Sequence, residues 1–586
     1  MAESQDQAGT EHEVVRIETE ALCGRCRLVA IWLKNEEHER DGYGLLTIGH
    51  SSKCPMCIWL LEIFRIPIKI TSPDAVILLS RLPGPCYSSR TVPYLYWQPD
   101  SGFDHVQHYV LPLDDGQSTK NLKDTFRLLD RRNIDFNRLR YWINYCQTNH
   151  GHACTRNTQM NGTPPAKEFA IKVIDCKHRM ITAAALSMPY VALSYVWGTG
   201  VPGIIEEKPS PDGDLHNLLP DSLPRTIEDA IFATLQLGYR YLWVDKYCID
   251  QSDLLELHTQ LSLMNSIYQA ASVTIVAASG ADSNFGLPGV SDRCRTPQML
   301  MHLDQTAWAL IKPSLEQPVL KSAWSTRAWT YQESFFSRRQ LFFTDQQVLF
   351  ECCEMSCCEL VDRPLGKATK SEWHITRRGN GHMSPLHVRK VFPLHISSYT
   401  KRLLTYQSDV LRAMQGLFSY FASPSIGKAN RRLQFWGICV SPEAYSSRHH
   451  TYSVDEELRL ALAQGLCWYR SSNEVMLEPL GTKRRNGFPS WSWSGWNIPI
   501  NWFLHNRIEK LSRWNLVYAV SLEKRNGAQV PFTAALAEQL CTMSSEDIGV
   551  TYLSLEDEVG GMYQSGNRSS TYGRLGSGSL GGGNSF

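Results

Sequence analysis

The stretch Tyr190-Val-Ala-Leu-Ser-Tyr-Val-Trp-Gly198 is a nearly continuous apolar run that ends in polar and aromatic residues. Such a run is typical of a strand that is covered on both faces of a parallel sheet. Two other stretches share this character, Leu242-Trp-Val-Asp-Lys-Tyr-Cys-Ile-Asp-Gln251 and Arg327-Ala-Trp-Thr-Tyr-Gln-Glu333. If their polar ends meet in space they form a site; if not, they are part of the core.

The surrounding segments alternate between strand and helix patterns. A helix is expected after Pro224, capped by Thr226 with Asp229 as an imperfect capping box, and ended by Gly238. The expected strands are 191–196, 241–244 and 273–278, preceded by a hairpin of 169–174 and 180–183, with a second helix over 257–271. This alternation predicts a parallel α/β sheet, in which ligands bind at the carboxyl ends of the strands.

Bulk properties indicate an ordinary globular protein of several domains. The chain has 586 residues, too many for one hydrophobic core. Its 59 basic and 58 acidic residues give a net charge of +1, which offers no support for nucleic acid as a partner. The polar start is unlike a signal peptide, and no apolar run approaches the roughly 18 residues of a membrane span. Seventeen cysteines in such a chain favour a reducing compartment, and we expect the cytoplasm.

Composition divides the chain into five segments. The linker-like Asn161-Gly-Thr-Pro-Pro165 separates a cysteine-containing N-terminal region from the α/β block, and a Gly/Ser-rich tail closes the chain. The expected segments are a disordered start (1–15), the N-terminal region (16–165), the α/β domain (166–350), a mixed α/β accessory region (351–560) and a disordered tail (561–586).

The chain resembles fungal heterokaryon incompatibility (HET) domain proteins. The resemblance covers roughly residues 169–345 and rests on five blocks in the family's order. They are Tyr190-Val-Ala-Leu-Ser-Tyr-Val-Trp-Gly198, Leu223-Pro-Arg-Thr-Ile-Glu-Asp-Ala230, Tyr241 to Gln251, Met264-Asn-Ser-Ile-Tyr-Gln-Ala-Ala271 and Arg327 to Glu333. Lys246 and Asp250 depart from the family's usual residues, so ligand contacts in their loop are the least transferable.

The resemblance implies a role in fungal non-self recognition and in the cell death that follows incompatible fusion. It also implies kinship with Toll/interleukin receptor (TIR) domains, and therefore a flavodoxin/TIR-like three-layer fold around a parallel sheet. Some TIR domains cleave NAD with a glutamate in a Trp-Cys-x-x-Glu motif. Trp329-Thr-Tyr-Gln-Glu333 has the same interval. The competing class is a non-catalytic module that signals by homotypic self-association, and a third is a zinc-bearing adaptor that binds another protein.

Glu333 is the candidate catalytic residue. In NAD cleavage the leaving group is a pyridinium, which needs no general acid, so one carboxylate can suffice by holding the ribose and stabilising the oxocarbenium-like transition state. The alternative is a helix glutamate that pairs with Arg327 or Arg338, or is solvated.

The candidate substrate-binding residues are Ser194, Tyr195, Trp197, Gly198, Asp245 and Trp329. Trp197 could stack on a ring of NAD or cap the sheet core, and Gly198 would let the backbone approach a phosphate. Asp245 could accept hydrogen bonds from ribose or cap its own turn. Cys248 fits a buried apolar filler better than a nucleophile, because nothing places a histidine beside it.

Two Cys-x2-Cys pairs, Cys23/Cys26 and Cys54/Cys57, form a candidate zinc site. Their separation is wider than in a usual zinc ribbon, and buried, unligated thiols are the alternative. Cys146, His150 and Cys154 form a further group of potential ligands. Adjacent cysteines such as Cys352-Cys353 point to opposite faces of a strand, so no dedicated site is expected there.

Overall fold

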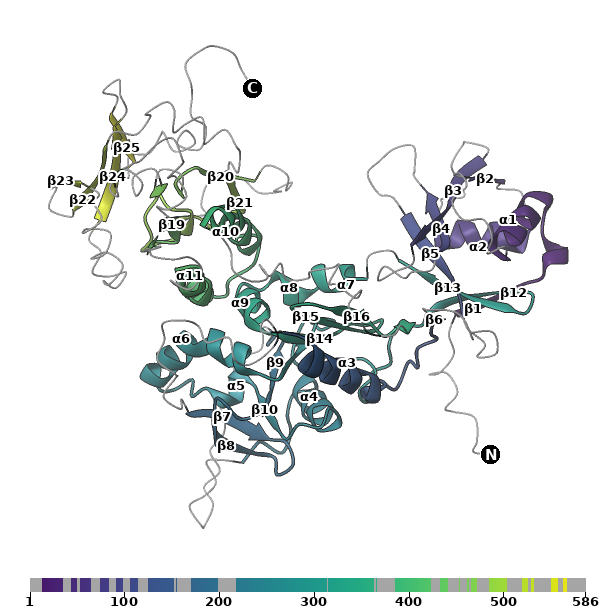
Figure 1. Cartoon of the computed structure of the whole chain (residues 1–586), viewed down its shortest axis with the longest axis horizontal. Helices are drawn as coiled ribbons and strands as arrows, with labels where there is room; N and C mark the ends of the chain where they lie inside the picture. The colour runs from purple at the N-terminus through teal and green to yellow at the C-terminus, as the bar shows by residue number, and fades with distance from the viewer. Residues whose placement is uncertain are drawn as a thin grey trace.

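We describe the chain from a computed structural model (Figure 1). The structure describes residues 13–34, 44–49, 53–64, 74–83, 91–97, 106–113, 125–151, 154, 170–198, 218–312, 315–362, 365, 385–422, 433–440, 453, 461–462, 465–471, 484–502, 519–524, 529–531, 550–556 and 562–565.

An eight-stranded mixed sheet forms the centre of the molecule (Figure 1). Its strands are β7 (Ala170–Asp175), β8 (Met180–Ala185), β9 (Val191–Ser194), β10 (Tyr241–Trp243), β11 (Val273–Ala277), β14 (Arg339–Phe343), β15 (Val348–Cys352) and β16 (Ser356–Cys358). Their spatial order is β16-β15-β14-β11-β9-β10-β7-β8. The four middle strands, β14-β11-β9-β10, are parallel, and the outer pairs are antiparallel.

The sequence predicted this sheet well. The hairpin and the three expected strands are present, and every residue of β9 and β11 is buried. This confirms a mixed α/β domain with a parallel core. The fourth parallel strand, β14, was not expected; its five residues are also fully buried. Helices around the sheet are α3 (Phe136–Asn149), α4 (Arg225–Gln236), α5 (Asp245–Cys248), α6 (Leu254–Ala270), α7 (Gln317–Leu320), α8 (Ala323–Thr326) and α9 (Trp329–Phe336).

The predicted cap of α4 is wrong. The N-cap residue is Pro224, which offers no side-chain hydrogen bond. Thr226 lies inside the first turn, where its Oγ1 accepts a hydrogen bond from the backbone of Gly286. Asp229 likewise accepts one from the backbone of Leu287. These side chains fasten the loop after β11 onto the helix, an interaction between distant segments that local capping rules do not reveal.

The N-terminal region forms a second sheet around which α1 (Gly24–Lys34) and α2 (Pro55–Ile63) pack. Its strands are β1 (Glu13–Ile17), β2 (Gly44–Gly49), β3 (Asp74–Pro83), β4 (Thr91–Trp97), β5 (Val106–Pro112), β12 (Met299–Leu303) and β13 (Thr306–Ile311). The hairpin β12–β13 pairs with β1 on one side and β5 on the other. The long segment between β11 and α9 therefore supplies two strands of this sheet.

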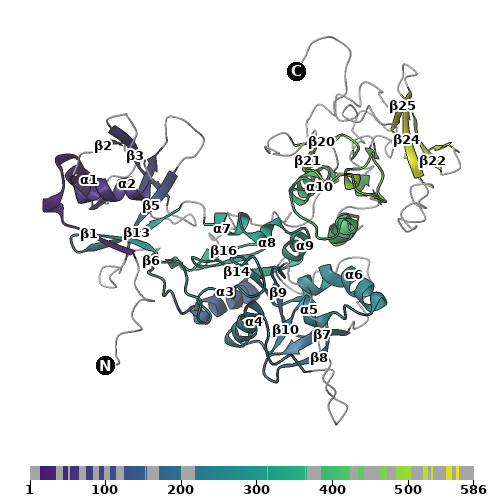
Figure 2. The same ribbon diagram turned by 180° about the vertical axis from the view of Figure 1, so that it is seen from behind.

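The C-terminal region contributes to the same core as the central sheet. Trp493 is fully buried, and its indole donates to the Gly437 carbonyl over 2.9 Å. The region contains α10 (Pro385–Tyr399), α11 (Gln415–Ala422), and strands β18 (Leu433–Phe435), β19 (Ile438–Val440), β20 (Trp468–Arg470), β21 (Ile500–Trp502), β22 (Ala519–Lys524), β23 (Gln529–Pro531), β24 (Val550–Glu556) and β25 (Met562–Ser565). Figure 2 shows it and the N-terminal sheet on opposite sides of the central sheet.

Two strands include residues that the sequence assigned to disordered ends. Strand β1 begins at Glu13 and β25 ends at Ser565. Residues 1–12 and 566–586 lie outside the described part of the chain. Within the described residues, no helix combines the length and the apolar character that crossing a membrane requires.

A buried ion pair fixes the segment before α3 against the central sheet. Arg295 and Glu359 are each 2% exposed and lie 2.5 Å apart. The Arg295 guanidinium also donates to the carbonyls of Asp130 and Asn133. Arg295→Leu would leave the Glu359 carboxylate buried without a counter-charge. We expect it to lower the free energy of unfolding by about 3–5 kcal/mol.

Urea denaturation followed by tryptophan fluorescence measures this loss. The matched control is Lys172→Met, which breaks the partly exposed Lys172–Glu256 pair. That change should cost no more than about 1 kcal/mol. Equal losses from the two variants would contradict the importance of the buried pair.

Candidate functional site

The three stretches quoted from the sequence converge at the carboxyl end of β9. Ser194, the last residue of β9, donates a hydrogen bond from Oγ to Glu333 Oε2 over 2.5 Å. Glu333 lies on α9 and is 5% exposed, whereas Ser194 is 1% exposed. The Trp324 indole donates to Ser194 Oγ over 2.7 Å. Because this bond occupies the hydroxyl as an acceptor, it orients the Ser194 proton toward Glu333.

The second pair of predicted residues lies at the end of β10. The Trp197 indole nitrogen donates to both carboxylate oxygens of Asp245, over 3.1 and 3.0 Å. Asp245 opens α5 and also accepts from the backbone of Lys246 over 2.8 Å. Asp245 lies in the first turn of α5, whose N-cap is Val244, and presents a half-buried carboxylate. Its contact with ribose stays a prediction. Trp197 packs against the main core cluster.

Burial holds both carboxyls partly protonated near neutral pH. Burial, followed by the charge of Asp245, raises the pKa of Glu333 to about 7. Burial likewise raises the pKa of Asp245 to about 6, against the opposing charge of Arg327. Among the ion pairs of the described residues, none joins Glu333 to an arginine. Glu333 is thus neither solvated nor in the buried ion pair considered as its alternative.

Two arginines set the electrostatics around these carboxyls without binding them. Arg327 donates to the Tyr195 carbonyl over 2.6 Å. Arg402, from the C-terminal region, donates to the Arg327 carbonyl and to Thr330 Oγ1 at the start of α9. Burial lowers the pKa of Arg402 to about 10, with the charge of Glu333 among the opposing contributions. The charges of Arg327 and Arg402 therefore act on Glu333, while its carboxylate accepts its hydrogen bond from Ser194.

The other predicted binding residues are Tyr195, Gly198 and Trp329, and they differ in their surroundings. Tyr195 is 3% exposed, and its hydroxyl has no hydrogen-bond partner among the described residues. Burial, followed by the charge of Asp245, raises the pKa of Tyr195. Gly198 adopts a φ of 90°, and a Cβ there would lie 2.7 Å from the Asp282 side chain, so the position requires glycine. Trp329 instead donates to Asp409 over 3.4 Å and faces the C-terminal region.

Sequence reasoning missed Trp324, Tyr268 and Arg402. The Tyr268 hydroxyl donates to the Leu193 carbonyl over 3.1 Å and is among the contacts that lower the pKa of Glu333. Tyr268 lies in one of the quoted sequence blocks, Met264 to Ala271, and that block could have indicated it as a site residue. Trp324 and Arg402 carried none, because their roles depend on packing between distant segments.

Comparison with known proteins bears on this same part of the chain. Residues 190–333 match the family model described as Heterokaryon incompatibility protein (HET). The match begins beside β9 and ends at Glu333. The chain carries a HET domain. A curated relative, "Heterokaryon incompatibility protein 6, OR allele" of Neurospora crassa, is 28% identical over 178 residues. That alignment covers 27% of this chain and 26% of the relative. No solved structure matches.

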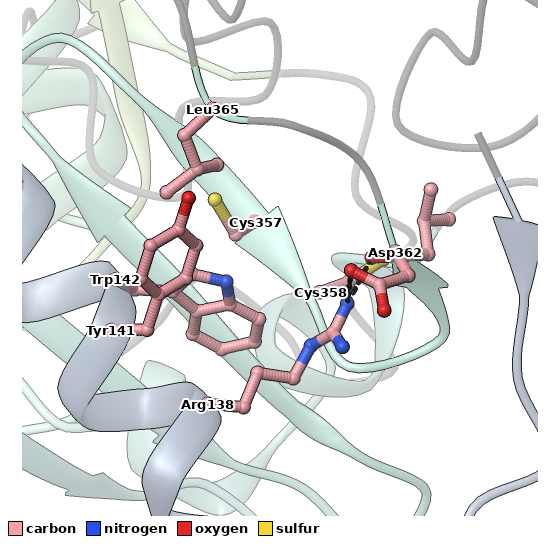
Figure 3. Close-up of a pocket in the computed structure, with 8 residues that line it drawn as sticks. Arg138, Tyr141, Trp142, Cys357, Cys358, Asp362 and Leu365 are labelled. Atoms are coloured by element: carbon pink, nitrogen blue, oxygen red, sulfur yellow. Dashed lines mark hydrogen bonds and ion pairs between the residues drawn. The ribbon is translucent and has the colours of Figure 1, made fainter. Parts of the chain in front are cut away.

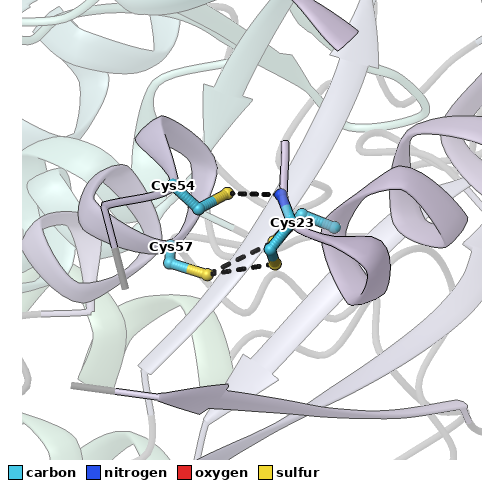
Figure 4. A group of neighbouring side chains, drawn as sticks. Cys23, Cys54 and Cys57 are labelled. Atoms are coloured by element: carbon cyan, nitrogen blue, oxygen red, sulfur yellow. Dashed lines mark hydrogen bonds between the residues drawn. The ribbon is translucent and has the colours of Figure 1, made fainter. Parts of the chain in front are cut away.

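The predicted cysteine cluster assembles in the N-terminal region, outside the HET domain. Cys23 precedes α1 and Cys54 is the N-cap residue of α2, while Cys26 and Cys57 lie in the first turns (Figure 4). The four sulfurs lie within 4.8 Å of one another. Cys57 Sγ is 3.4 Å from Cys26 Sγ and 3.9 Å from Cys23 Sγ. The Cys23 backbone donates to Cys54 Sγ. This arrangement could bind a metal ion.

A small pocket lies between α3 and the outer edge of the central sheet (Figure 3). Arg138 crosses it, donates to the Val361 carbonyl over 2.6 Å and pairs with Asp362 over 3.2 Å. Trp142 and Cys357 line its wall. The pocket shares no residue with the Glu333 cluster, and its own charged groups already have partners, so it does not describe the candidate site.

Proposed function

We propose that this protein acts in fungal non-self recognition and the ensuing cell death. We also propose that its HET domain cleaves NAD, with Glu333 as the catalytic residue. The family match and the name of the Neurospora crassa relative support the biological role. The buried Glu333 carboxyl, which accepts a hydrogen bond from Ser194 and has no ion pair among the described residues, is the observation that supports the chemistry. We place the protein in the cytoplasm, where NAD is available.

The topology supports a flavodoxin/TIR-like fold. In chain order the parallel strands β9, β10, β11 and β14 are numbers one to four, and their spatial order is 2-1-3-4. Flavodoxin-like doubly wound sheets share this order, and their ligands bind where it reverses, between strands one and three. Ser194 ends β9, and β9 pairs with β11. The Ser194–Glu333 contact therefore lies where such a fold binds its ligand.

The chemistry needs only one carboxylate. The C1′–N bond of NAD breaks with its electron pair leaving on nicotinamide, a water oxygen bonds to C1′, and one proton is released. Ionised Glu333 stabilises the positive charge that develops on the ribose, and its burial strengthens this interaction. Asp245 and Tyr195 bind the ribose hydroxyls, and Ser194 orients Glu333.

We also propose zinc at Cys23, Cys26, Cys54 and Cys57. Four thiolates in tetrahedral geometry form a structural zinc site with sulfur–sulfur distances of about 3.8 Å, given a Zn–S bond of about 2.3 Å. The distances from Cys57 Sγ to Cys26 Sγ and Cys23 Sγ, 3.4 and 3.9 Å, are close to that spacing. A zinc ion here would join α1 to α2 without touching the HET domain.

Nicotinamide release separates the enzyme from the interaction module. Purified protein, concentrated enough to self-associate, is incubated with NAD as wild type, Glu333→Gln and Glu316→Gln. The control Glu316 is a half-buried glutamate at the start of α7, outside the cluster. Release by wild type and Glu316→Gln alone supports the proposal. Background release from all three would overturn it in favour of a non-catalytic, homotypic signalling module.

A further inference from the structure

A second group of metal-ligand side chains lies against the edge of the central sheet. The ligand atoms of Cys146, His150, Cys154 and Cys352 are all within 4.8 Å of one another. The sequence indicated the first three as potential ligands, but it gave no reason to add Cys352. We propose that these four residues bind a zinc ion, which joins the segment before the HET domain to the segment after it. The proposal is independent of NAD cleavage.

Local structure brings the first three ligands together. Cys146 lies in the last turn of α3, and His150 follows it by four residues, one helical turn. The Cys154 backbone donates to the Gly151 carbonyl over 3.1 Å, which holds Cys154 near the end of the helix. The spacing Cys-x3-His-x3-Cys thereby directs one imidazole and two thiols toward the sheet.

The fourth ligand comes from the other side of the HET domain. Cys352 is the last residue of β15, and its Sγ lies 3.3 Å from His150 Nδ1, although the two residues are 202 positions apart. In a tetrahedral Cys3His zinc site, neighbouring ligand atoms lie about 3.5–3.8 Å apart. The observed distance needs only a small expansion. Cys146, Cys154 and Cys352 are each at most 1% exposed and form no disulfide.

A buried arginine supplies the charge that such a site requires. Arg339 is 5% exposed, and its Nε donates to Cys146 Sγ over 3.1 Å. Its other nitrogens donate to the carbonyls of Ser272 and Cys154. Within the described residues it contacts no carboxylate. Three thiolates and a zinc ion have a net charge of −1, which the Arg339 guanidinium neutralises.

Backbone groups around the cluster resemble the outer shell of a structural metal site. The Met355 backbone donates to Cys352 Sγ over 3.2 Å, and the Gly151 backbone donates to Glu354 over 3.1 Å. Such outer contacts orient metal ligands and tune their basicity. Because the family match covers 190–333, the ligands before and after it would tie together segments that the HET domain separates in sequence.

Metal analysis of purified protein tests the proposal. In Cys26→Ser/Cys57→Ser, which removes the N-terminal cluster, we expect one zinc per chain with three sulfur and one nitrogen ligands by X-ray absorption. Adding Cys352→Ser should remove that zinc. Adding Cys176→Ser, a buried thiol outside both clusters, should not. His150→Ala should lose the zinc and His150→Cys should retain it with four sulfur ligands.

Two results would overturn the proposal. One is a folded Cys26→Ser/Cys57→Ser protein without zinc. The other is a zinc content that neither Cys352→Ser nor His150→Ala lowers. If the double variant fails to fold, wild type decides: zinc bound through sulfur and nitrogen supports the site, whereas zinc bound through sulfur alone contradicts it.

Discussion

Glu333→Gln is expected to slow nicotinamide release from NAD by about 10²–10³-fold, the usual effect of removing one preorganised electrostatic group. The amide keeps the size of the side chain and a hydrogen bond with Ser194, but it cannot carry the negative charge that opposes the developing cation. Because only ionised Glu333 is active, wild-type release should rise with pH through about 7, the pKa of this carboxyl. The measurement is the rate of release between pH 5 and 9.

The same variant should be more stable than wild type at high pH. The pKa of Glu333 rises from 4.5 to about 7 on folding, so between these values the folded chain binds more protons than the unfolded chain. The stability of wild type therefore falls as pH rises through this window, and the neutral amide escapes the loss. The shift corresponds to at most on the order of 3 kcal/mol.

Thermal melting of wild type and Glu333→Gln at pH 5 and pH 8 measures this difference. Asp245→Asn is the matched control, because the pKa of Asp245 is raised in the same direction but less, to about 6. A smaller gain in stability is expected from it. If Glu333→Gln melts below wild type at pH 8, the ionised carboxylate stabilises the fold. That result would contradict a carboxylate whose charged form is destabilised by burial.

The local hydrophobic pattern of the sequence was enough to predict the buried strands of the central sheet. The apolar runs ending at Ser194 and Trp243 are strands because only a sheet covered on both faces buries such runs. Parallel strands bring their carboxyl ends to one edge, which explains why Trp197 after β9 contacts Asp245 after β10. The binding and catalytic roles of these residues and of Glu333 stay predictions.

Contacts between distant segments could not be predicted in this way. The Trp324 indole donates to Ser194, 130 residues away in sequence, and Arg402 of the C-terminal region donates to Thr330 on α9. Cys352 looked like an ordinary strand cysteine, because nothing in its neighbourhood shows that the end of α3 lies beside it. The hairpin β12–β13 has a strand pattern, yet its pairing with the N-terminal sheet follows from topology alone.

If the N-terminal cluster binds zinc as proposed, removing the metal is expected to unfold α1 and α2. Cys26 is fully buried and Cys57 is 3% exposed, at the contact between the two helices. Binding of a structural zinc supplies about 10–16 kcal/mol in zinc-finger peptides at pH 7, more than a small region can otherwise provide. Cys26→Ser should therefore make this region sensitive to protease in the native protein.

The central sheet should survive this change, because its core cluster shares no residue with the one around Cys26. Limited proteolysis followed by mass spectrometry should show cleavage within 23–64 and protection of 170–198. Cys294→Ser, a half-buried thiol outside both metal clusters, is the control and should leave the digestion pattern unchanged. If Cys26→Ser resists protease as wild type does, these thiols are packing residues, since loss of a folding metal cannot leave the helices it joins unaffected.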